Sequence, residues 1–247
     1  MNNFELISFA DADELASHAA GAWLDEIESA NRAGKPHCVA LPGGRIAQKF
    51  FAATVEQAKA RKIGDGGTPS LPTNVHFFWA DERCVPPTDS ESNFKLANDF
   101  LLAPLKISPS QIHRIRGEDS PQAAAQLAEK ELRRFAPGKG GQPMLDLIFL
   151  GMGEDGHVAS LFPGAPPEVS GCAGPFVAIE NSPKPPAQRI SLSPGAIAAA
   201  GRVWVLVSGA GKEAALRESL RPGGRTPLAG VIQSRSRTKI FSDIRLD

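Results

Sequence analysis

Apolar residues recur along this chain in two spacings, and the two spacings alternate. Between Asp11 and Arg32, the apolar residues Leu15, Ala19, Trp23 and Ile27 stand four positions apart. That spacing predicts an amphipathic helix with one buried face. Shorter runs of consecutive apolar residues follow it and predict buried strands.

The alternation continues to the end of the chain. Strands are expected at 37–41, 75–80, 145–150, 176–180, 189–193, 203–207 and 239–241. Further helices are expected from Arg45, with Ile46, Phe50 and Ala53 inward, at 93–102, at 121–135 and near Gly211. Residues 64–73 and 81–92 read as loops, and 138–143 as a minor boundary.

Strands that alternate with helices indicate an α/β fold with a mainly parallel twisted sheet, Rossmann-like, and helices on both faces. We expect a single domain over residues 1–247. Loops containing Gly43, Asp81, Gly151 and Ser208 follow the carboxyl ends of predicted strands. In an open α/β sheet, ligands bind at that edge.

Composition narrows the possible partners. The 27 basic and 27 acidic side chains cancel, which provides no overall field for nucleic acid or an anionic membrane. No apolar stretch approaches the roughly 20 residues of a membrane span. The three cysteines and the absence of a signal-like N-terminus fit a cytoplasmic protein. An anionic ligand therefore needs a local cluster of cations.

The segment Leu145–Gly164, LDLIFLGMGEDGHVASLFPG, is the most informative in the chain. Its GMGEDG matches the letters of a dinucleotide-binding fingerprint. We reject that function because Glu154 and Asp155 would face the phosphates and the following prolines would curtail the helix. His157, after a strand, is instead a candidate general base. Asp155 either orients the imidazole or bonds to its own backbone in the turn.

Candidate phosphate ligands lie in three separate loops. Gly43 and Gly44 let backbone N–H groups approach an anion at the start of a helix. Arg189 begins a predicted strand, and Lys212 stands near a predicted helix start. The chain contains no G-x-S-x-G, C-x-x-C, H-E-x-x-H or Walker A sequence, so these residues give no support for serine-nucleophile, zinc or ATP chemistry.

Taken together, these segments resemble the family that contains 6-phosphogluconolactonase and glucosamine-6-phosphate deaminase/isomerase. The matching pieces, in order, are Leu41–Gly44, Trp79–Pro86 with Asp89 and Ser92-Asn93, Leu150–Gly164, Ser182–Pro186 with Arg189, and Ser208–Lys212. The resemblance implies hydrolysis of 6-phospho-D-glucono-1,5-lactone to 6-phosphogluconate in the pentose phosphate pathway, without metal or organic cofactor.

The same resemblance implies roles for individual residues. His157 would activate water, and Gly43, Gly44, Arg189 and Lys212 would hold the phosphate. Asp81, Arg83, Asn93 and Lys184 would line or brace the sugar end. Many relatives have Gly-Gly-Ser-Thr-Pro in the first loop where this chain has Gly43-Gly44-Arg45. Arg45 then either replaces the missing hydroxyls with a charge or points to solvent.

Two other functions stay open from the sequence. A deaminase/isomerase would have a further carboxylate shortly after the histidine, where Ser160–Gly164 offers none. A sugar-phosphate-binding module without catalysis is the second, although a regulator would need a DNA-binding segment that the sequence does not show. The pattern says nothing of oligomeric state.

Overall fold

The computed structural model describes residues 3–61, 71–138 and 142–246. Most of the predicted 64–73 loop and the middle of the 138–143 segment therefore lie outside the described residues. Six parallel strands form the main sheet in the order β1-β9-β8-β5-β2-β3. Their bounds are β1 Phe4–Ser8, β2 His37–Leu41, β3 Val75–Trp79, β5 Leu147–Gly151, β8 Arg202–Val207 and β9 Thr238–Ser242.

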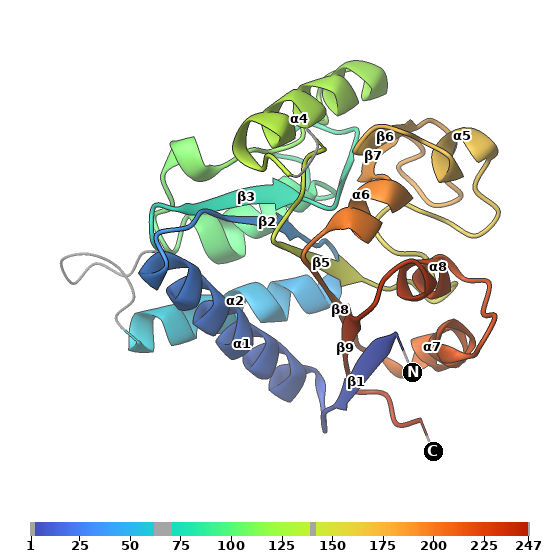
Figure 1. Ribbon diagram of the computed structural model, residues 1–247, viewed down its shortest axis with the longest axis horizontal. Helices are drawn as coiled ribbons and strands as arrows, with labels where there is room; N and C mark the ends of the chain where they lie inside the picture. Colours follow the sequence, from blue (N-terminus) through green and yellow to red (C-terminus); the bar gives the residue numbers. More distant parts are fainter. Residues whose placement is uncertain (1–2, 62–70, 139–141, 247) are drawn as a thin grey trace.

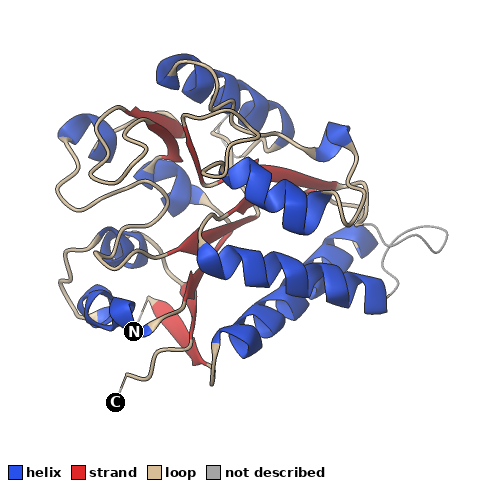
Figure 2. Ribbon diagram, turned by 180° about the vertical axis from the view of Figure 1, so that it is seen from behind, coloured by secondary structure: helices blue, strands red, loops and turns tan. Residues whose placement is uncertain are grey.

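Helices cover both faces of this sheet, as the alternating pattern predicts (Figures 1 and 2). The helices α1 Ala12–Arg32 and α2 Arg45–Ala60 lie side by side on one face. The helices α6 Pro194–Ala199, α7 Glu213–Leu220 and α8 Pro227–Gln233 lie on the other. Short helical segments complete the chain at α3 Asn93–Ala97, η2 Asn98–Leu102, η3 Pro109–Gln111, α5 Pro167–Ser170 and η5 Ala210–Lys212.

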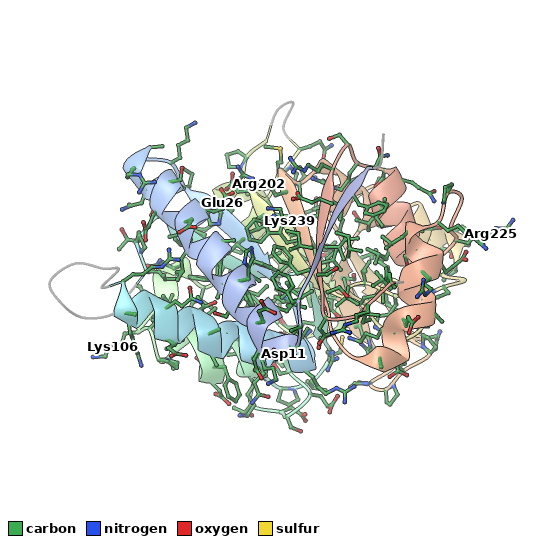
Figure 3. The ribbon with its side chains drawn as sticks, turned by 90° about the horizontal axis from the view of Figure 1, so that it is seen from below. Asp11, Glu26, Lys106, Arg202, Arg225 and Lys239 are labelled. Atoms are coloured by element: carbon green, nitrogen blue, oxygen red, sulfur yellow. The ribbon has the colours of Figure 1, made fainter. Side chains whose placement is uncertain are left out.

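Helix α1 shows how local sequence and packing agree. Asp11 caps its start by accepting hydrogen bonds from the backbone N–H groups of Asp13 and Glu14. The predicted apolar stripe, including Trp23 and Ile27, is fully buried against the sheet. At its outer face, Glu26 pairs with Arg202 at 3.1 Å, which ties α1 to the start of β8 (Figure 3).

A second, antiparallel sheet was not expected. It has the order β4-β7-β6, with β4 Asp81–Arg83, β7 Arg189–Leu192 and β6 Phe176–Ile179. Helix α4 Pro121–Phe135 packs on it. The prediction of a loop throughout 81–92 is wrong at its start, because Asp81 and Arg83 pair with residues of β7 that are distant in sequence. This pairing brings Arg189 beside Asp81 and Arg83.

Candidate active site

A cleft opens at the carboxyl ends of β2, β3 and β5, the edge that the strand pattern predicts. It encloses about 560 Å³ of empty space, including the part open to solvent. Nine of the eleven residues proposed from sequence line it: Gly43, Gly44, Arg45, Asp81, Arg83, Asn93, His157, Arg189 and Lys212. The other two are not among the lining residues: Asp155 bonds to His157, and Lys184 forms an ion pair with Asp155.

His157 is held by the loop that follows β5. Its Nδ1 bonds to the Asp155 carboxylate, and its backbone carbonyl accepts a hydrogen bond of 2.9 Å from Gly153 N–H. Lys184 lies on the far side of Asp155, with Nζ at 3.3 Å from Oδ2. A proton on Nδ1 is favoured by the carboxylate, so the lone pair of the neutral ring lies on Nε2. Asp155 thus orients the imidazole in addition to bonding the backbone N–H of His157 at 3.3 Å.

Burial and charge set the protonation of this pair. Burial lowers the pKa of His157, against an opposing effect of Asp155. For Asp155 burial favours the neutral acid, but the hydrogen bond from His157 and the His157 and Lys184 charges outweigh it and lower its pKa to about 2. The pair is therefore a carboxylate beside a neutral imidazole at neutral pH, which suits a general base.

Gly153 is a site residue whose role the sequence did not reveal. A Cβ at this position would lie 2.0 Å from His157 Cε1 and 2.7 Å from Asp155 Oδ1. Any side chain would therefore displace the imidazole from its carboxylate. Ala159, two residues after His157, adopts φ 48°, a left-handed conformation that is costly for a residue with a Cβ. The surrounding turn holds it, and such strain is typical of functional loops.

Asp81 is fixed by hydrogen bonds from both sides. Asn93 Nδ2 donates to its backbone oxygen at 2.9 Å and to Oδ1 at 3.2 Å, while Ser160 Oγ donates to Oδ2 at 2.6 Å. Gly43 makes room for Asn93, because a Cβ there would come within 2.1 Å of its Oδ1. The first glycine loop, β4 and the histidine loop are thereby joined around one buried carboxylate.

Glu82 was not singled out in the sequence, yet its side chain positions Asn93. The carboxylate is 2% exposed and accepts four hydrogen bonds at the start of α3. The donors are the backbone N–H groups of Arg83, Asn93 and Phe94 and the hydroxyl of Ser92, at 2.7–3.0 Å. Burial raises the pKa of Glu82, and these four bonds oppose that rise and favour the carboxylate.

We expect Glu82→Gln to lower the free energy of unfolding by about 2–4 kcal/mol, because an amide NH₂ would face buried donors. Chemical denaturation of the variant measures this. Glu56→Gln, on the exposed side of α2, serves as the matched control and should change stability by less than about 0.5 kcal/mol. Equal stability of the two variants would contradict the capping role of Glu82.

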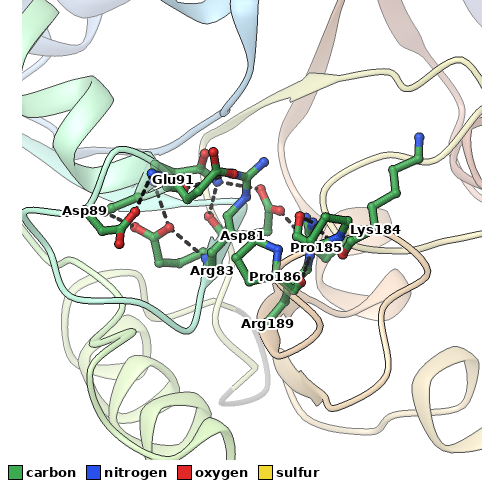
Figure 4. A network of polar contacts seen from close by, with 12 residues as sticks. Asp81, Arg83, Asp89, Glu91, Lys184, Pro185, Pro186 and Arg189 are labelled. Carbon is green, nitrogen blue, oxygen red and sulfur yellow. Dashed lines mark hydrogen bonds and ion pairs between the residues drawn. The ribbon is translucent and has the colours of Figure 1, made fainter.

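Arg189 lies in the cleft, but most of its donors are already used. Nε donates to the carbonyl of Pro186 at 3.0 Å, and Nη2 donates to the carbonyls of Lys184 and Pro185 at 3.1 and 2.9 Å (Figure 4). Nη1 lies 3.4 Å from Ser160 Oγ. The residue therefore secures the proline-rich loop, and only Nη1 has a donor left for a ligand.

Arg83 contributes a second guanidinium to the same wall (Figure 4). Its Nη1 donates to the backbone oxygen of Glu91 at 2.8 Å and lies 3.4 Å from that residue's carboxylate. Its Nε is buried and has no hydrogen-bond partner in the part of the chain that the structure describes. The Lys184 side chain extends away from Arg83 and Asp81 (Figure 4), so it braces Asp155 and does not line the cleft.

Two further cations line the cleft with side-chain donors that are not already used. Arg45 and Lys212 both line it, and neither side chain forms a hydrogen bond or ion pair within residues 3–61, 71–138 and 142–246. Burial, followed by the nearby Arg45 charge, lowers the pKa of Lys212. Arg45 is exposed and is the first residue of α2, whose N-cap Gly44 has φ 88° and offers no side-chain cap. Two unpaired cations beside free helix N–H groups form a favourable place for a phosphate.

The described residues give no support for two other kinds of site. No group of three or more His, Cys, Asp and Glu side chains arranged for a metal ion occurs among them. None of the helices within those same ranges is long and apolar enough to cross a bilayer.

Known proteins resemble this chain over most of its length. The family model described as glucosamine-6-phosphate isomerases/6-phosphogluconolactonase matches residues 10–240. A 6-phosphogluconolactonase from Mycobacterium leprae is 32% identical over 231 residues, covering 91% of this chain and 90% of that protein. One from Treponema pallidum is 40% identical over 141 residues, covering 56% of this chain but only 57% of that protein.

Structural comparison agrees with the sequence matches. The crystal structure of devB protein has a TM-score of 0.81 and 30% identity, covering 97% of this chain and 96% of that chain. The parallel sheet and the order of motifs expected from the sequence are thus confirmed at the level of the fold. This chain belongs to the glucosamine-6-phosphate isomerase/6-phosphogluconolactonase family.

Proposed function

We propose that this protein hydrolyses 6-phospho-D-glucono-1,5-lactone to 6-phosphogluconate in the pentose phosphate pathway, as 6-phosphogluconolactonase. One observation carries the proposal: a neutral imidazole, oriented by a carboxylate, shares a cleft with the unpaired cations Arg45 and Lys212. A lactone that is phosphorylated at the far end of its chain needs both features. The names of the relatives support the same substrate.

The chemistry requires only water and one base. Nε2 of His157 takes a proton as the water oxygen attacks the lactone carbonyl carbon. The bond between that carbon and the ring oxygen then breaks, and the proton held by the imidazolium passes to the ring oxygen. Asp155 stabilises the imidazolium between these steps, in the way a buried carboxylate supports a catalytic histidine. A strained cyclic ester held beside a positioned water needs no covalent intermediate.

The other residues are assigned by their place in the cleft. Arg45, Lys212 and the backbone at Gly43 and Gly44 hold the phosphate, with Arg189 Nη1 as an additional donor. Asp81, Arg83 and Asn93 line the sugar end, and Lys184 braces Asp155. We propose that residues 1–247 act as one catalytic domain in the cytoplasm, on a small phosphorylated lactone and with no nucleic-acid or membrane partner.

A coupled assay tests the proposal. Glucose-6-phosphate dehydrogenase generates the lactone, and its disappearance is followed with and without this protein, above the spontaneous rate. Acceleration that scales with enzyme concentration supports the proposal, while a rate equal to the spontaneous one refutes it. Glucosamine 6-phosphate is tested in parallel, since release of ammonia would identify a deaminase. Saturable binding of the phosphosugar without turnover would instead identify a binding module.

The pH dependence of the reaction follows from the shifted pKa of His157. Because the base must be neutral and its pKa lies below 6.5, we expect kcat/KM to stay constant through neutral pH and to fall only in more acidic solution. A pH profile measured with short reaction times checks this. An acid limb of kcat/KM centred above pH 7 would contradict the assignment of a buried neutral imidazole as the base.

A further inference from the structure

Phe162 contacts the catalytic histidine from outside the cleft. Its ring centroid lies 4.5 Å from that of His157, and the guanidinium carbon of Arg189 stands 5.6 Å from the Phe162 centroid. The side chain is 6% exposed, and it is not among the residues that line the cleft. Phe162 therefore touches two residues of the site and is not placed to touch a ligand.

Phe162 also lines a second, largely apolar cavity. This apolar groove contains about 1060 Å³ of empty space, counting the part open to solvent. Its walls come from the histidine loop, α5, α6 and α8, and they include Leu161, Phe162, Val169, Pro194, Thr226 and Val231. One aromatic ring thus contacts the imidazole and also lines an opening that water can enter.

We infer that Phe162 is a positioning residue for the proposed reaction: its ring holds His157 against Asp155 and keeps the water of the apolar groove away from the imidazole. The inference rests on the proposed function only for the use of His157 as a base. The shielding itself is a property of the free protein and is measurable without substrate.

Shielding by Phe162 has a defined electrostatic consequence. The charged groups that act on His157 are Asp155 in its own loop, Asp81 on β4 and Lys184 in the proline-rich loop. Burial has a larger effect than any of these and lowers the pKa. A smaller side chain at 162 admits water to the imidazole while those three charges remain. The pKa of His157 should then rise, because a solvated imidazolium is less costly.

The test follows the His157 ring protons by NMR as pH changes, in protein without substrate. In Phe162→Ala, His157 is expected to titrate at higher pH than in the wild type. In Phe162→Leu, the midpoint should shift in the same direction but by less. Val231→Ala, which widens the same groove from α8, is the matched control and should leave the midpoint unchanged. The acid limb of kcat/KM should shift by the same amount as each midpoint.

Phe162→Leu keeps most of the packing, so it preserves the test if the alanine variant does not fold. Two results would overturn the inference: a wild-type midpoint in the Phe162 variants, or an equal rise in Val231→Ala. If the midpoints move as expected but no variant hydrolyses the lactone, the shielding stands and the proposed function fails. A purely structural role would lower stability and leave the titration where it was.

Discussion

Replacing His157 with alanine is expected to lower kcat by roughly 10²- to 10⁴-fold, the usual effect of losing a general base. The fold should survive, because the side chain lies in the cleft and leaves the β5 strand intact. The measurement is the initial rate of lactone hydrolysis after subtraction of the spontaneous rate. Added imidazole should restore part of the activity, since it can enter the space left by the side chain.

The control for this variant is His18→Ala, which removes an exposed histidine from α1. It should retain the wild-type kcat. Turnover of the His157 variant within a factor of about three of the wild type would show that the imidazole is not the base, since that change is far below the effect of general-base catalysis.

Replacing Lys212 with alanine is expected to raise KM by roughly 10- to 150-fold and to change kcat little. A hydrogen bond to a charged group contributes about 1.5–3 kcal/mol, and the phosphate is remote from the carbonyl that reacts. Arg45 should partly compensate, so the double variant Arg45→Ala/Lys212→Ala should bind still more weakly. Steady-state kinetics over a wide range of lactone concentration separates kcat from KM.

Lys59→Ala, in the exposed last turn of α2, provides a control that removes one positive charge away from the cleft. Its KM should match the wild type. A KM for Lys212→Ala equal to that control would place the phosphate away from the Arg45–Lys212 pair, with Arg83 and Arg189 as the alternative cations among the described lining residues of the cleft. Arg189→Ala is a less clean test, because it also releases the carbonyls of the proline-rich loop.

Local sequence patterns were sufficient for most of the fold. The helix at 121–135 and the strand at 37–41 match the structure residue for residue, because the helix has a regular apolar stripe, the strand is a short apolar run, and turn residues bound both. Strand β1 was missed because residues 4–7 are only half-buried. They do not form the fully apolar run that predicts a central strand. Strand β4 was missed because three residues carry no periodicity and its partner lies about a hundred positions away.

The sequence predicted the site residues that directly follow a strand. It did not predict the residues whose role depends on packing. His157 stands out in the sequence because a histidine follows a glycine turn after a buried strand. Glu82 does not, because its role depends on a helix that starts eleven residues later. Gly153 and Phe162 matter through contacts with the imidazole ring itself, which no spacing of residues reveals.

The central claim is that the neutral imidazole of His157 is the base that activates water. The most direct measurement compares two midpoints: that of the acid limb of kcat/KM, and that of His157 titrated by NMR in the free protein. We predict that they coincide below pH 6.5 and that the limb is absent from the residual activity of His157→Gln. Two distinct midpoints, or a limb that persists in that variant, would contradict the claim.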